Sequence, residues 1–191
     1  MIMKCLLFCL LPFGLVAQPT IRELKQGKYA EDTSYIYALP YEKGKSYLLA
    51  QAYHSKMSHK GEYALDFKMK EGTKICAARS GVVVSLREDS DRGGLKPEFL
   101  SDGNYIIILH DDGSYANYWH LKKDGVLVNE GDTVKQGEVI GLSGNTGYSA
   151  FPHLHFEVSA QAGAGNGQVP TRFRTKKGVR YLRPMKWHKA V

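Results

Sequence analysis

From about residue 51 to residue 159, hydrophobic and polar positions along the chain follow the pattern of short β-strands. Runs of Val, Ile, Tyr and Phe are separated by Gly, Asp and Asn, which is typical of strands joined by tight turns. The clearest runs are residues 81–86 (GVVVSL), 104–110 (NYIIILH) and 153–159 (HLHFEVS). Residues 104–120 predict a hairpin with Asp111-Asp112-Gly113 in its turn. No stretch here has the apolar stripe of a three-turn helix, so the pattern predicts one antiparallel β domain.

The segments on either side of this region are less regular. Residues 18–50 mix charged and tyrosine-rich stretches without clear periodicity, and residues 161–191 form a basic extension that starts in a glycine-rich loop. A polar loop, residues 87–103, interrupts the strands and is expected to line one rim of the domain. We therefore divide the chain into an N-terminal segment (18–50), a β domain (51–160) and a C-terminal extension (161–191).

The first 17 residues have the order of a secretory signal peptide. Lys4 precedes an apolar run that ends in small residues at Val16-Ala17. The run is shorter than the roughly 20 residues that a transmembrane helix needs. We therefore expect a mature chain without a transmembrane segment, secreted or in the periplasm; a retained amphipathic anchor is the alternative.

The net charge and the cysteines add little to the predicted fold and location of the protein. The formal net charge is +7, and a basic secreted protein is attracted to polyanions such as cell-wall polymers, anionic lipid or nucleic acid. Solubility alone would explain the charge equally well. Cys5 and Cys9 leave with the signal peptide, so Cys76 is alone and cannot form an internal disulfide. Its apolar neighbours predict a buried structural thiol.

Two histidines one residue apart raise the first question of chemistry. On a strand, His153 and His155 point to the same face and Leu154 to the other. Two imidazoles on one face of an apolar strand are costly unless each has a partner. A metal is one such partner, and carbonyls, waters or carboxylates are the alternative.

Three further residues strengthen the metal interpretation. Asp66 lies within an apolar run and follows His59 by seven residues, and His120 closes an aromatic strand. Two histidines and one carboxylate, with one coordination position left open, are the pattern of catalytic zinc. Two further histidines could then act on the bound water or on an oxyanion. The chain has no His-Glu-x-x-His helix, which excludes the commonest zinc protease geometry. His110 and His188 are predicted to be structural and solvent-facing, respectively.

The chain resembles the lysostaphin-like (LytM-type) zinc metallopeptidases in five ordered stretches: HKGEYALDF, AARSGVV, DGSYANYWHL, VNEGDTVKQGEVIGLSGNTGYS and PHLHFEV. Together they cover roughly residues 51–159. The resemblance implies a two-layer, sandwich-like antiparallel β fold of the duplicated hybrid motif type, with a narrow groove. It also implies hydrolysis of peptide bonds in peptidoglycan cross-links, with one zinc ion as cofactor.

The resemblance also implies a role for each candidate residue. The metal ligands would be His59, Asp66 and His155, and the catalytic groups that do not bind the metal would be His120 and His153. The usual ligand spacing in this family is His-x-x-x-Asp, whereas six residues separate His59 from Asp66. Because of this longer spacing, His54 is an alternative to His59 as the first ligand.

Two other functions remain open from the sequence. Some relatives have lost metal ligands and act as non-catalytic activators of cell-wall amidases, and retention of all five groups argues against this function. The stretch VNEGDTVKQGEVIG also resembles biotinyl and lipoyl carrier domains, but it continues into Ser143-Gly144-Asn145 without the displayed lysine. We therefore expect a monomeric peptidase that acts on peptidoglycan peptides and does not bind nucleic acid.

Overall fold

The computed structural model describes residues 21–26, 35–160 and 167–191. The predicted signal peptide, residues 1–17, and most of the glycine-rich loop, residues 161–166, lie outside the described residues. Regular structure is almost entirely β, with a short helix α1 (Ile21–Lys25) and a 3₁₀ turn η1 (Pro97–Phe99). The predicted all-β fold is therefore confirmed. In the part of the chain that the structure describes, no helix has the length and apolarity needed to cross a membrane.

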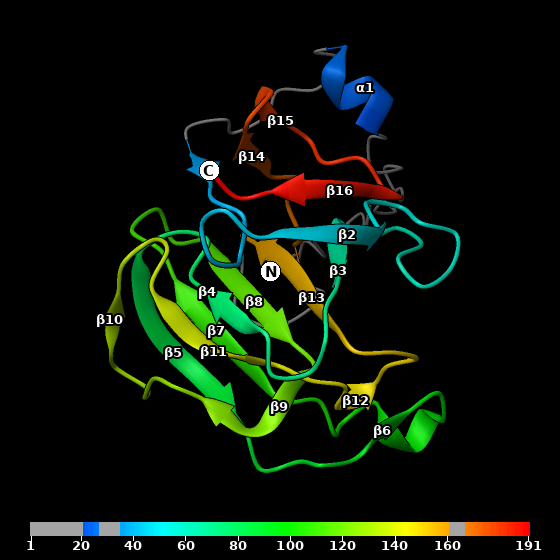
Figure 1. The fold of residues 1–191 in the computed structure, drawn as a ribbon, viewed down its shortest axis with the longest axis vertical. Helices are drawn as coiled ribbons and strands as arrows, with labels where there is room; N and C mark the ends of the chain where they lie inside the picture. The colour runs from blue at the N-terminus through cyan, green and yellow to red at the C-terminus, as the bar shows by residue number, and fades with distance from the viewer. Residues whose placement is uncertain (1–20, 27–34, 161–166) are drawn as a thin grey trace, which may run out of the picture.

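An eight-stranded antiparallel sheet forms the larger layer (Figure 1). In spatial order its strands are β10 (Thr133–Val134), β5 (Gly81–Arg87), β7 (Tyr105–Leu109), β8 (Tyr115–Trp119), β13 (His153–Ser159), β3 (Ala64–Lys68), β2 (Ser46–Gln51) and β16 (Lys186–Lys189). Strands β7 and β8 form the predicted hairpin.

A three-stranded sheet packs on part of this layer. It consists of β4 (Lys74–Cys76), β11 (Val139–Ser143) and β9 (Leu121–Val126). The hydroxyl of Tyr118, on β8, accepts a hydrogen bond from the backbone N–H of Ala78 at 2.8 Å, just beyond β4. Tyr118 is fully buried, while its neighbour Trp119 points to the opposite face. Cys76 is also buried, as predicted.

Segments outside the predicted β domain complete the core. A third sheet joins β1 (Ile36–Tyr37) to β14 (Arg172–Thr175) and β15 (Gly178–Arg180), and a two-stranded pair joins β6 (Gly93–Gly94) to β12 (Gly147–Tyr148). Phe173 of β14 is fully buried and packs on Phe156 of β13, with 5.9 Å between ring centroids. The large sheet also starts before residue 51, because β2 begins at Ser46. The described parts of the N-terminal segment and the C-terminal extension therefore belong to the same folded unit.

The register between β13 and β3 determines which side chains of the two strands lie next to each other on the face opposite the core. Leu154 pairs with Phe67, and both are fully buried. The alternate positions, among them His155 opposite Asp66, point to the other face of the sheet. This face carries the candidate site.

Candidate metal centre and active site

Asp66 and His155 face each other near the middle of the eight-stranded sheet. They are direct partners in the pairing of β3 with β13. The imidazole Nδ1 of His155 lies 3.0 Å from Oδ1 of Asp66. The pairing of two central strands therefore places a nitrogen and a carboxylate side by side without any contribution from a loop.

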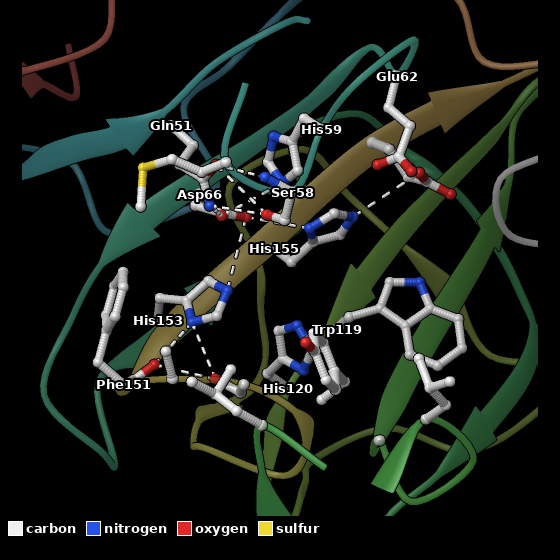
Figure 2. Close-up of a pocket in the computed structure, with 18 of the residues that line it drawn as sticks. Gln51, Ser58, His59, Glu62, Asp66, Trp119, His120, Phe151, His153 and His155 are labelled. Carbon is white, nitrogen blue, oxygen red and sulfur yellow. Dashed lines mark hydrogen bonds and ion pairs between the residues drawn. The ribbon is translucent and has the colours of Figure 1, made fainter. Parts of the chain in front are cut away.

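His59 reaches the same carboxylate from the segment between β2 and β3. Its Nε2 lies 3.2 Å from Oδ2 of Asp66, and its side chain is only 2% exposed. The backbone N–H of Glu62 donates to the carbonyl of His59 at 3.0 Å, which closes a turn directly after the histidine. The six residues between His59 and Asp66 accommodate this turn. The candidate ligand atoms of His59, Asp66 and His155 all lie within 4.8 Å of one another (Figure 2).

The hydrogen bonding of the two ring nitrogens of His59 indicates whether these residues suit a metal. Neither Nδ1 nor Nε2 makes a hydrogen bond to any described residue, although the ring is buried. Nε2 has only its 3.2 Å contact with Asp66. A buried polar atom without a hydrogen bond costs about 1–3 kcal/mol, and a metal ion held by His59 and Asp66 would lower this cost. Two imidazoles and one carboxylate are a zinc donor set that leaves one position open for water or substrate. The residues present therefore fit a catalytic zinc ion.

The three groups shift one another's protonation. Burial disfavours the ionised form of Asp66, but the imidazoles of His155 and His59 outweigh burial and hold the pKa of Asp66 well below its usual value. Burial likewise disfavours a charged His155, but hydrogen bonding to Asp66 and Glu157 raises the pKa of His155 to about 10. Asp66 is therefore an anion at neutral pH, and a metal that binds His155 displaces a proton.

His120 stands at the end of β8, beside the candidate metal centre. Its backbone is in the left-handed region, with φ of 65°, which turns the side chain out of the strand. Its Nδ1 lies 2.7 Å from the carbonyl oxygen of Thr146. Because a carbonyl only accepts hydrogen bonds, Nδ1 carries the proton and Nε2 does not.

His153 is fixed in the same way at the start of β13. Its Nδ1 lies 2.7 Å from the carbonyl oxygen of Phe151, so Nδ1 carries the proton, and the unprotonated Nε2 lies 3.5 Å from Oδ1 of Asp66. The rings of His153 and His120 are 4.6 Å apart. Burial lowers the pKa of both; for His120 the neighbouring imidazoles add to burial and lower its pKa to about 3. Both rings are therefore neutral at pH 7.

Gln51 is a site residue that sequence reasoning missed. At the end of β2, its Nε2 donates to Oδ2 of Asp66 at 2.7 Å. Its Oε1 accepts from the backbone N–H and the hydroxyl of Ser58, each at 3.3 Å, and from the hydroxyl of Ser55 at 2.9 Å. One side chain thus orients the carboxylate and anchors the loop that leads to His59. No sequence pattern marks Gln51, because the role depends on the pairing of β2 with β3.

An open groove of about 680 Å³ lies over these residues. The predicted rim loop, residues 87–103, contributes Leu95 and Leu100, which are 61% and 68% exposed. Tyr148 and Phe151 line the groove from the loop before β13. Pairing of β6 with β12 connects these two loops. The groove is therefore walled by apolar side chains and has its polar groups at the base.

The remaining histidines of the described chain lie elsewhere. His54 packs edge-on against Tyr63 with 4.7 Å between ring centroids and does not join the ligand cluster. His110 is buried, and its Nδ1 lies 2.9 Å from the carbonyl of Ser80. His188 lies on the edge strand β16. The geometry therefore favours His59 over His54 as the first ligand.

Comparison with known proteins gives a family match over the same region. The model of a family described as Peptidase family M23 matches residues 59–168, which is more than half of the chain. The matched region contains all five candidate residues.

Two individual proteins are similar in sequence to the same region of the chain. Lysostaphin of Staphylococcus staphylolyticus is 44% identical over 96 residues, which cover 50% of this chain and 18% of that protein. The peptidoglycan DD-endopeptidase ShyA of Vibrio cholerae is 40% identical over 93 residues, which cover 49% of this chain and 19% of that protein. The chain thus spans about a fifth of the length of these relatives.

A solved structure has the same fold. The catalytic domain of the antimicrobial peptidase lysostaphin from Staphylococcus simulans superposes with a TM-score of 0.50 at 31% identity. The superposition covers 66% of this chain and 87% of that domain.

Proposed function

The chain belongs to peptidase family M23, and on that premise we propose that it is a zinc metalloendopeptidase that hydrolyses peptide cross-links of bacterial peptidoglycan. The observation that carries this proposal is the convergence of five side chains at the base of one groove: three candidate ligands and two neutral histidines. Similarity to lysostaphin and to a peptidoglycan DD-endopeptidase supports the substrate class.

In this proposal His59, Asp66 and His155 hold one zinc ion. Zinc, when bound, supplies a Lewis acid that polarises a carbonyl and makes water a nucleophile near neutral pH. Asp66 contributes the negative charge of the ligand set, and Gln51 keeps the carboxylate in place through its 2.7 Å hydrogen bond.

In this proposal His120 and His153 act as the general acid–base groups. Each donates its Nδ1–H to a backbone carbonyl and presents an unprotonated Nε2. One ring can therefore accept a proton from the attacking water, and the pair can then stabilise the oxyanion or protonate the leaving amine. The carbonyls fix both ring orientations before substrate binds, so little reorganisation is needed during the reaction.

A non-catalytic activator of cell-wall amidases is the alternative within this fold. An activator needs neither a complete ligand set nor oriented histidines. Here the three candidate ligands converge and both further rings are held by carbonyls, so a peptidase is the better reading. We also propose that the protein acts outside the cytoplasm, as a monomer, without binding nucleic acid.

The direct test uses purified peptidoglycan sacculi. The wild-type protein should clear a suspension of sacculi, lose this activity with a chelator and regain it when zinc is restored. Mass spectrometry of the released muropeptides should show new peptide termini, which would also identify the bond that is cut. The His120→Ala variant is expected to release no muropeptides. Clearing that persists in chelator, or release of sugar fragments instead of peptides, would contradict the proposal.

A further inference from the structure

Glu157 lies on the side of His155 that faces away from Asp66. The two residues share one face of β13, because side chains two positions apart on a strand point the same way. Nδ1 of His155 is 3.0 Å from Asp66 Oδ1 (Figure 2), and its Nε2 is 3.7 Å from Glu157 Oε2. Glu157 is 3% exposed, so its carboxylate is held beside the ring and not in solvent.

Gln168 holds the carboxylate of Glu157 from outside β13. Its Nε2 donates to Oε2 of Glu157, and its Oε1 accepts from the backbone N–H of Tyr63 at 2.7 Å. The backbone of Gln168 is itself fixed by a β-bridge to Ser159, at the end of β13. The amide therefore uses both its donor and its acceptor in the groove.

Tyr63 connects this arrangement to the other candidate ligands. It follows the turn that carries His59 and directly precedes β3, the strand of Asp66. The side chain of Gln168 thus spans from the strand of His155 to the segment between His59 and Asp66. Its loss would loosen both segments.

A histidine ligand works best when its second ring nitrogen donates to a fixed acceptor. Such a bond selects the tautomer, stops rotation of the ring and makes the ligating nitrogen more basic. Loss of an outer partner of this kind typically costs about 10- to 100-fold in metal affinity. With Nδ1 of His155 turned toward Asp66 and His59, Glu157 is the group placed to accept from Nε2–H.

We propose that Glu157 is a positioning residue that fixes His155 for metal binding, and that Gln168 holds Glu157 in this role. The inference rests on the proposed zinc site but does not depend on the substrate. It extends the working site to Gln168, a residue of the C-terminal extension.

The experiment measures zinc affinity directly, by competition with a chromophoric chelator. We expect Glu157→Ala to bind zinc about 10- to 100-fold more weakly than wild type. Glu157→Gln keeps an oxygen that can accept from Nε2–H, so a smaller loss is expected, and Gln168→Ala should lose about threefold to tenfold. Replacing zinc with cobalt adds a second readout: the visible absorption of bound cobalt should shift in Glu157→Ala, because the ring of His155 is no longer fixed.

Glu62→Gln is the matched control. Glu62 lines the same groove, and its replacement removes a carboxylate without removing the partner of a ligand, so zinc affinity should stay within about twofold of wild type. Equal affinity in wild type, Glu157→Ala and Gln168→Ala would overturn the positioning role while leaving the zinc site intact. If Glu157→Ala does not fold, Glu157→Gln and Gln168→Ala decide. A wild-type protein that binds no zinc would contradict both this inference and the proposed function.

Discussion

Replacing Gln51 with leucine removes a side chain that orients a candidate ligand without being one itself. The substitution keeps a similar side-chain volume but deletes the amide. Asp66 loses the 2.7 Å hydrogen bond at Oδ2, and Ser58 and Ser55 lose their acceptor. The carboxylate and the loop before His59 should therefore both become less constrained.

The size of the effect follows from these contacts. A hydrogen bond to a charged group contributes about 1.5–3 kcal/mol, and each neutral bond about 0.5–1.5 kcal/mol. Asp66 is buried, so water does not fully replace the lost donor. We expect Gln51→Leu to lower the free energy of unfolding of the metal-free protein by about 2–4 kcal/mol. Zinc affinity should fall by roughly 10- to 100-fold, as for other outer partners of ligands.

Urea unfolding without metal and chelator competition with zinc measure the two effects separately. Ser58→Ala is the matched control: it disturbs the loop but keeps the bond between Gln51 and Asp66, so zinc affinity should change by less than about threefold. If Gln51→Leu unfolds at the wild-type urea concentration and binds zinc with wild-type affinity, the assigned role of Gln51 is wrong.

Two further predictions concern pH and the backbone. Burial lowers the pKa of His110 below its usual 6.5. As the pH falls, the unfolded chain therefore binds this proton at a higher pH than the folded chain does. The contribution of His110 to the free energy of unfolding should be complete above about pH 6.5 and decrease as the pH falls below that value. His110→Gln should therefore lose less unfolding free energy than wild type between about pH 7.5 and about pH 5.5, and equal losses would contradict this. Gly147→Ala should impair sacculus clearing and stability, because φ is 78° and a Cβ would lie 2.7 Å from the Cα of Gly103, beside His120. Gly113→Ala has the same sign of φ but nothing within 4 Å, so it should cost only about 1 kcal/mol, measured by urea unfolding.

Local patterns in the sequence predicted the strands that are longest and most regular. The hairpin of β7 and β8 and the strand β13 have clear alternation and turn residues, and the structure confirms them. Alternation alone also placed His153 and His155 on one face. The same rule places Glu157 on that face of β13, but alternation does not show that its carboxylate lies beside the ring of His155.

Pairing between distant segments could not be predicted in the same way. Asp66 meets His155 because of the register of β3 against β13, which tertiary packing sets. Gln51 and Gln168 join the site from β2 and from beyond β13, where nothing in the local sequence marks them. Strands β14 and β15 are only four and three residues long, too short for periodicity to show. Their place in the fold depends on long-range contacts such as Phe173 with Phe156.

Metal analysis of two variants separates the proposed roles of the two neighbouring histidines, His155 as a zinc ligand and His153 as a catalytic group. Zinc content and sacculus clearing should be measured on His155→Ala, His153→Ala and wild type. His155→Ala should lose zinc and activity together, whereas His153→Ala should lose activity and keep stoichiometric zinc. Stoichiometric zinc in His155→Ala would contradict these roles.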